Sequence, residues 1–402
     1  MVRIFPSSLS WTRLGANSFR LPSSQETLTP LCLRLFRASY PVHTTPLSPL
    51  LLKNKHIQPL LRRTITSSAS IVRLMEVAES KKDRKGLEAS LQASLELELS
   101  TIPPYLCCLW SMKEPLSEVY DLIRSIVLDE MLHVGLAANM LTAIGATPKF
   151  NTPQALPKYP SVLPGGVRPE LHVHLQGLTK EYIKNILMEI ETPEHGPVAL
   201  HKGFNYPTIG SFYHAILSTF QRLIAENSVS ITGERQMTSW VGGGEGLFPI
   251  HSIENVARAI EQIRHEGEGT SQSPHTGVPH DPTEYAHYYK LAQVYHGRKL
   301  IQVGEQYQYA GDLIDFPEVF PMAKVPPEGY AASREFDILY SRMVDKLNDA
   351  WAQGSQSSLD EASGDMFALG DHATRLMSTP IDSTQPELGN LGPSFIYYPK
   401  HI

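Results

Sequence analysis

Glu130-Met131-Leu132-His133 places a carboxylate and an imidazole three residues apart in an apolar helical pattern. A second copy, Glu284-Tyr285-Ala286-His287, occurs later in the chain. Residues three apart project from the same face of a helix. A four-helix bundle with Glu-x-x-His on two helices and one Glu on each of the others holds two iron or manganese ions. The two motifs therefore predict an all-α bundle around a two-metal centre.

The spacing of apolar residues predicts that most of the chain is helical. Apolar side chains recur every three or four residues, as on the buried face of a helix, over residues 81–109, 116–144, 179–190, 209–227, 253–265, 284–303, 336–351 and 359–377. Pro103 and Pro104 should kink or restart the first helix. Residues 146–177 are rich in proline and glycine, and the alternation at 171–175 predicts an edge strand or an extended connection. This segment suits the long crossover between two helical hairpins.

Glu98 is a further candidate ligand, because it lies in the apolar stripe of the first helix between Leu95 and Ile102. A carboxylate on a core-facing stripe is costly unless it is paired, protonated or bound to metal. A single Glu-x-x-His is most often a solvated or hydrogen-bonded pair, but two copies together with Glu98 favour a metal centre.

We therefore predict Glu98, Glu130 and His133 as catalytic and metal-binding residues, with Glu284 and His287 as further metal ligands and Glu130 as the bridge. Carboxylate and imidazole ligands suit one or two non-haem iron ions, or manganese, better than a closed structural zinc site.

The first 75 residues differ in composition from the rest. They contain eight Arg and two Lys against one acid, Glu26, and many Ser and Thr. An Arg-rich, acid-poor leader is typical of an organelle transit peptide. We expect residues 1–75 to direct the protein to mitochondria, with the cytoplasm as the alternative if the segment is a disordered tail or if Met75 is the true start. Residues 80–395 are expected to form one domain.

Charge and hydropathy exclude two classes of partner. Residues 76–402 contain 25 basic and 40 acidic residues, a formal charge of −15, which repels nucleic acid and anionic lipid. No run of apolar residues is long enough to predict a membrane span. The three cysteines, Cys32, Cys107 and Cys108, match neither a disulfide framework nor a metal-binding spacing.

Longer motifs extend from the candidate ligands. Two are specific: Leu97-Glu98-Leu99-Ser100-Thr101-Ile102-Pro103-Pro104-Tyr105-Leu106 and Asp129-Glu130-Met131-Leu132-His133. The pattern continues with Ile190-Glu191-Thr192-Pro193-Glu194 and Thr208-Ile209-Gly210-Ser211-Phe212-Tyr213. With others over residues 87–395, they resemble the ferritin-like domain family that includes the iminophenyl-pyruvate dimer synthases of bisindole pigment pathways. The resemblance implies a ferritin-like bundle, a redox-active iron site and a small-molecule substrate, with oxidative coupling of aromatic imino or keto acids as the expected reaction.

One position departs from the family pattern. Where the family commonly has Glu after Thr-Ile-Gly in the third bundle helix, this chain has Ser211. His214, on the same face one turn later, is one candidate replacement, and Glu191 is another. Five ligands instead of six would leave one metal position weak, or open to substrate and oxygen.

These observations predict a metal-dependent oxidase or oxygenase of secondary metabolism, acting with oxygen or peroxide on a small organic substrate. The expected fold is an all-α, ferritin-like four-helix bundle with a long crossover and additional C-terminal helices, as a monomer or a homo-oligomer. One alternative is a non-catalytic iron-binding or iron-storage protein. Another is a scaffold that has lost a metal ligand and serves as a partner in an assembly.

Overall fold

The structure, a computed structural model, describes residues 71–76, 81–193, 209–240, 246–270, 273–277 and 283–399. All of them belong to one unit of the chain, residues 61–402. The predicted leader as far as residue 70, and Cys32 within it, lie outside the described residues. Residues 71–76 form a short helix, α2 (Ile71–Glu76), and its Ile71 is fully buried against Gly165. The end of the segment expected to be a leader therefore packs on the domain.

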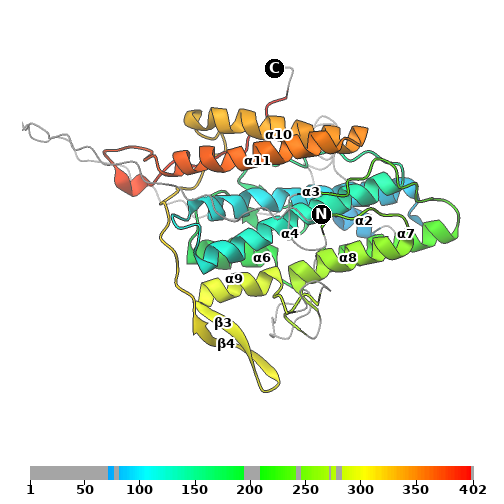
Figure 1. Ribbon diagram of the computed structural model, residues 1–402, viewed down its shortest axis with the longest axis horizontal. Helices are drawn as coiled ribbons and strands as arrows, with labels where there is room; N and C mark the ends of the chain where they lie inside the picture. Colours follow the sequence, from blue (N-terminus) through cyan, green and yellow to red (C-terminus); the bar gives the residue numbers. More distant parts are fainter. Residues whose placement is uncertain are drawn as a thin grey trace, which may run out of the picture. The chain divides into compact units, whose positions relative to one another are not determined.

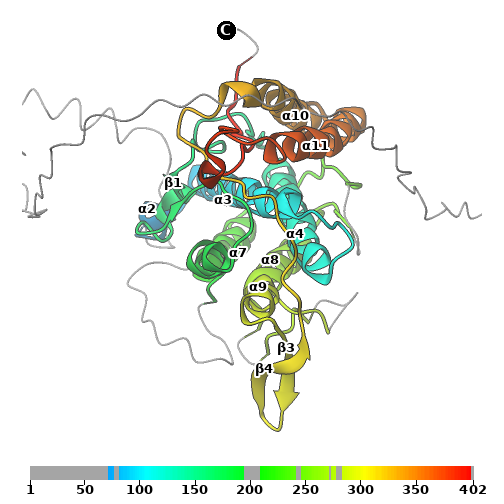
Figure 2. The same ribbon diagram turned by 90° about the vertical axis from the view of Figure 1, so that its left-hand side faces the viewer.

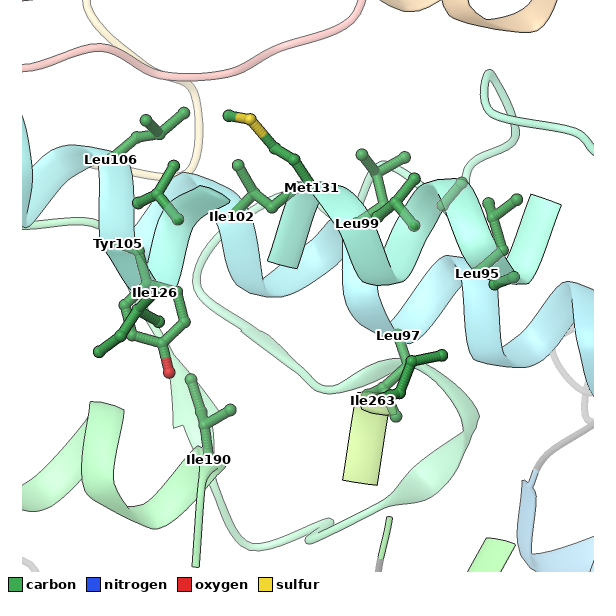
Figure 3. Packing of buried hydrophobic residues seen from close by; sticks show 14 of the residues in the cluster. Leu95, Leu97, Leu99, Ile102, Tyr105, Leu106, Ile126, Met131, Ile190 and Ile263 are labelled. Carbon is green, nitrogen blue, oxygen red and sulfur yellow. The ribbon is translucent and has the colours of Figure 1, made fainter. Parts of the chain in front are cut away.

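Two long helices, α3 (Arg84–Ser111) and α4 (Glu118–Ala143), run side by side through the centre of this unit (Figure 1). The side chains of Asp83 and Ser117 cap them by accepting hydrogen bonds from backbone N–H groups of the first turn. Most of α3 from Ser90 onward is buried, because other helices cover both of its sides. Figure 3 shows the consequence: Leu99, Ile102 and Met131 point to one side, and Leu97 and Tyr105 point to the other.

Of the two outcomes predicted for Pro103 and Pro104, a kink or a restart of the helix, the restart does not occur. The helix continues through both residues to Ser111. A proline inside a helix leaves the carbonyl four residues earlier without its N–H donor. For Pro104 that carbonyl belongs to Ser100, and the hydroxyl of Tyr159 donates a hydrogen bond to it at 2.5 Å. A side chain from the crossover thus replaces the missing backbone donor.

If α3 and α4 are counted as the first two rows of the four-helix bundle, the third and fourth rows each consist of separate helices instead of one continuous helix. The third row consists of α5 (Lys180–Tyr182), the π-helical turn η4 (Ile183–Leu187) and α6 (Met188–Ile190), followed later in the chain by α7 (Ile209–Ala225). The fourth row consists of α8 (Ile253–Glu268) and α9 (His287–His296), which lie end to end beneath α4 in Figure 1. Both breaks fall near the middle of α3 and α4, so helix ends from these rows meet there.

The prediction of a helix over residues 284–303 is wrong in two respects. Helix α9 begins only at His287, and Glu284 precedes it, next to a bridge between Tyr285 and His275. The helix ends at Gly297, whose φ of 67° is the left-handed conformation that terminates helices. Residues 298–303 then form β3 (Arg298–Val303), which pairs antiparallel with β4 (Gln306–Leu313) in a hairpin that extends away from the helices (Figure 2).

The crossover between α4 and α5 contains a minimal sheet. Strand β1 (Ser161–Val162) pairs antiparallel with β2 (His172–Val173), and the 3-10 turn η3 (Pro164–Gly166) lies between them. The strand predicted near 171–175 is therefore present, although it is only two residues long. The other predicted helices also form, with ends shifted by a few residues.

The C-terminal part of the chain covers the second face of α3 and α4. It contains the 3-10 turn η5 (Ala331–Ser333), the helices α10 (Arg334–Gln353) and α11 (Gln356–Met377) and the 3-10 turn η6 (Pro386–Leu388). In Figures 1 and 2, α10 and α11 lie on one side of the α3–α4 pair and α7, α8 and α9 lie on the other. The core is thus a three-layer stack with α3 and α4 in the middle.

Asn139 of α4 joins three segments in the core. Its fully buried amide donates to the carbonyls of Met237 and Phe248 at 2.8 and 3.0 Å. Its Oδ1 accepts hydrogen bonds from the backbone N–H of Met237 at 3.0 Å and from the indole Nε1 of Trp351 at 2.9 Å. The connection between α7 and α8, and the end of α10, are therefore both attached to α4 through one side chain.

Asp337 in α10 should make stability depend on pH. Burial raises its pKa to about 6, although it accepts hydrogen bonds from the Ser394 hydroxyl and the Ile396 N–H. Since the folded state then holds this proton more tightly than the unfolded chain, the contribution of Asp337 to stability should fall between about pH 4 and pH 6 and not change further above that. We expect Asp337→Asn to remove this change, which amounts to about 3 kcal/mol. Denaturation of both proteins at pH 4 and pH 7 measures it, and identical pH profiles would contradict it.

Helix α4 is the one helix, within the described ranges, that is long and apolar enough to cross a membrane by length and composition. However, 83% of its most apolar stretch is buried inside the protein, as expected for the central helix of a core.

Candidate metal centre

Two groups of side chains that could each hold a metal ion meet between α3 and α4. The first consists of Glu98, Glu130 and His133, and the second of Glu130, Glu191 and His287. In each group the ligand atoms lie within 4.8 Å of one another, and all five residues are buried. Glu130 belongs to both groups, which is the arrangement of a carboxylate that bridges two metal ions.

One face of α3 supplies the first carboxylate and part of its support. Glu98, Thr101 and Tyr105 follow one another at spacings of three and four residues, so they share a face of the helix. The hydroxyl of Tyr213 in α7 donates to Glu98 Oε1 at 2.5 Å, and that of Thr101 donates to Glu130 Oε2 at 2.9 Å. These bonds fix the orientation of both carboxylates.

Helix α4 contributes Glu130 and His133 from one face. The Nδ1 atom of His133 lies 3.7 Å from Glu98 Oε2 and 4.0 Å from Glu130 Oε1. Its Nε2 atom is hydrogen-bonded at 2.7 Å to Glu266 Oε2, in the last turn of α8. A carboxylate on the far nitrogen is the usual way of fixing the ring of a metal-binding histidine.

Helix ends supply the other two residues of the cluster. Glu191 follows the last residue of α6, and His287 is the first residue of α9. His287 Nδ1 lies 3.1 Å from Glu130 Oε1 and 3.7 Å from Glu191 Oε2. The hydroxyl of Tyr105 donates to Glu191, and Asp129 accepts from His287 Nε2 at 3.2 Å.

The buried charges of the cluster shift one another's pKa values. Burial raises the pKa of Glu130 to about 7, and the negative charges of Glu191 and Glu98 add to the effect. Burial opposes protonation of His133, but its hydrogen bonds to Glu266 and Glu98 outweigh this and raise its pKa to about 10. The pKa of His287 is likewise raised well above its usual value against burial, chiefly by hydrogen bonding to Asp129. The carboxylates thus favour the protonated, positively charged form of both imidazoles. Bound metal cations can supply the same positive charge.

The donor set fits metal binding. His287 Nδ1 is buried and makes no hydrogen bond to any residue in the described part of the chain, although Glu130 Oε1 is 3.1 Å away. A buried imidazole nitrogen that lies near carboxylate oxygens, but does not form a hydrogen bond with them, can bind the same cation as those oxygens. Carboxylate oxygens with one imidazole per group match the preferences of iron and manganese.

Four of the sequence-predicted residues come together, and two do not. Glu98, Glu130, His133 and His287 lie in the cluster. Glu284 instead forms an ion pair with Lys290, because it precedes α9 and so does not share a helix face with His287. His214 is exposed on α7, whereas Glu191, the other suggested replacement, is part of the cluster.

Glu266 is the main residue that the sequence reasoning missed. It continues the buried stripe Val256, Ile260 and Ile263 of α8, so it has the same signature, a carboxylate on an apolar stripe, that singled out Glu98. Asp129, Tyr105 and Tyr213 have no such signature, because their roles depend on which helices lie opposite them.

A small cavity reaches the cluster from the side of α8. Its lining combines the charged residues of the centre with apolar side chains: Leu97, Glu98, Thr101, Glu130, His133, Ile190, Glu191, Ile209, Ile263, Arg264, Gly267 and Glu268. A second cavity is almost wholly apolar and lies between α3–α4 and α10–α11, where Leu99 and Met131 point (Figure 3). The first cavity therefore gives access to the candidate ligands, and the second does not.

Comparisons with known proteins agree with this architecture. A family profile described as Ferritin-like matches residues 91–296, about half of the chain. A solved structure of a ferritin-like protein from Caulobacter vibrioides aligns with a TM-score of 0.50 and 20% sequence identity, over 78% of this chain and 97% of that one. A search of curated proteins finds no significant match. Together with the helical architecture, the two matches confirm the predicted fold class.

Proposed function

Because this chain belongs to the ferritin-like family, we propose that it is an oxidoreductase that binds two metal ions, iron or manganese, at the Glu130 cluster. The observation that carries the proposal is the pair of buried ligand groups that share Glu130. A cluster of acidic and histidine side chains costs folding free energy unless a bound cation or another partner compensates for the buried charge. Glu98 and His133 would hold one ion, Glu191 and His287 the other, and Glu130 both.

The surrounding residues would orient the ligands and exclude water. When bound, iron at such a site supplies the redox chemistry by which oxygen or peroxide oxidises an organic molecule. Thr101, Tyr213 and Glu266 hold Glu130, Glu98 and His133 in position through the hydrogen bonds given above. Preorganised ligands bind a metal without paying for reorientation, and the apolar walls of the cavity keep reactive species away from bulk water.

For the substrate, we propose a small organic molecule that enters through the cavity beside α8. The resemblance to iminophenyl-pyruvate dimer synthases supports an aromatic imino or keto acid of secondary metabolism, undergoing oxidation or oxidative coupling. The composition of the leader supports mitochondrial targeting. The targeting proposal is independent of the metal assignment.

Metal analysis of the purified full-length protein tests the proposal. We expect up to two iron or manganese ions per chain and oxygen consumption that depends on an added substrate. His133→Ala should lose at least one ion per chain, because it removes the only imidazole of the first group, while His214→Ala, an exposed histidine, should lose none. A His133→Ala protein with full metal content and activity would exclude this site. Many ions per chain in a large shell would instead indicate iron storage.

A further inference from the structure

Arg264 differs from the other charged residues that line the cavity of the candidate metal centre. It lies in α8, two residues before Glu266, and its Nε atom is enclosed and has no hydrogen-bond partner among the described residues. Nor does its guanidinium form an ion pair or hydrogen bond with any residue that the structure describes. By contrast, Glu98, Glu130, His133 and Glu191 all have partners within the cluster.

Among the described residues, no carboxylate of this cavity forms an ion pair with Arg264. Those of the centre contact one another's histidines, and Glu268 accepts a hydrogen bond from the Gly210 N–H at 3.0 Å, at the start of α7. A partly enclosed guanidinium loses part of its hydration. Only pairing with a hydrogen-bond acceptor compensates for the free energy lost in this way. Arg264 is therefore a cation in the access cavity that an incoming acceptor can reach.

We infer that Arg264 binds the carboxylate of a small organic acid and so orients this molecule toward the centre. This inference rests on the proposed function, since it specifies which molecules the cavity accepts. The planar guanidinium matches a carboxylate with two parallel hydrogen bonds. The apolar walls, Leu97, Ile190, Ile209 and Ile263, suit the hydrocarbon part of such an acid. A dianion such as phosphate is disfavoured, because Glu98, Glu130 and Glu191 line the same cavity.

The test compares a carboxylate with a neutral molecule of the same shape. Butyrate and butyramide are titrated into full-length protein loaded with Fe²⁺ under nitrogen, and the binding heat gives each Kd. The wild type should prefer butyrate by on the order of tenfold, as for a charge-assisted hydrogen bond. Arg264→Gln should lose this preference with unchanged iron content. Arg258→Gln is the matched control, because Arg258 is on the same helix but packs over Phe248 instead of lining the cavity.

Each other result overturns a defined part of the inference. Equal preference for butyrate in the wild type and in Arg264→Gln would show that Arg264 does not bind the carboxylate. Loss of iron from Arg264→Gln would assign the effect to metal retention. An equal loss of preference in Arg258→Gln would assign it to the general charge of the protein. A wild type without preference overturns the inference alone, whereas a wild type that binds neither iron nor manganese overturns the proposed function as well.

Discussion

Glu130→Ala is expected to release both metal ions from the proposed centre, whereas His133→Ala and His287→Ala should each release one. The reason is that Glu130 is the one residue shared by the two ligand groups. Its removal also leaves His287 Nδ1 without the carboxylate 3.1 Å away. We expect metal affinity to fall at least 100-fold, the upper end of the loss usual for a supporting residue. Elemental analysis after dialysis against a weak chelator gives the ions per chain for each variant.

Glu96→Ala is the matched control for this experiment. Glu96 is also a buried carboxylate, two residues before Glu98 on α3, but its partners are Gln92 and Thr152 and it lies outside both ligand groups. Its metal content should equal that of the wild type. If Glu130→Ala retained one ion, Glu130 would not be the bridge, and if both variants lost metal equally, the loss would reflect a general effect on the fold.

Asn139→Ala is expected to destabilise the protein strongly, because it removes the centre of a buried hydrogen-bond network. The change leaves the Met237 N–H, two backbone carbonyls and the Trp351 indole without their partner in a fully buried position. An unsatisfied buried polar group costs about 1 to 3 kcal/mol, so we expect a total loss of about 3 to 5 kcal/mol after partial relaxation. Urea denaturation followed by circular dichroism measures this loss.

Trp351→Phe tests whether the loss comes from the hydrogen-bond network. It removes one of the four hydrogen bonds and should destabilise the protein by less than Asn139→Ala. Because both substitutions break the same bond, the double variant should lose less stability than the sum of the two single losses. Strict additivity would mean that the bond between Asn139 and Trp351 does not contribute to stability.

The fold and most of the cluster were accessible from the sequence because they depend on local spacing. A carboxylate on an apolar stripe, as at Glu98 and Glu130, has a high cost that the sequence pattern reveals directly. The same rule applied to α8 would also have found Glu266. That α3 is not restarted at its prolines could not be predicted, because Tyr159, whose hydroxyl compensates for Pro104, comes from the distant crossover.

That Glu191 belongs to the cluster and Glu284 does not depends on tertiary structure. Glu284-x-x-His287 has the spacing of a helical ligand pair, but the helix begins only at His287, so Glu284 forms an ion pair with Lys290 instead. Glu191 follows a π-helical turn and a short helix, and the hydroxyl of Tyr105 anchors it. Neither the start of α9 nor the position of Tyr105 opposite α6 follows from residue spacing.

The interruption of the third and fourth rows of the bundle gives the proposed centre two mechanically unequal halves. Glu98, Glu130 and His133 project from the middle of continuous helices, so they cannot shift without displacing a whole helix. Glu191 and His287 lie at helix ends, so a helix holds the backbone on one side of each only, and the backbone before His287 is held by the shorter Tyr285–His275 bridge. We therefore expect the binding position at Glu98 and His133 to be rigid and the position at Glu191 and His287 to be more flexible. Exchange of metal or entry of a co-ligand should occur mainly at the flexible position.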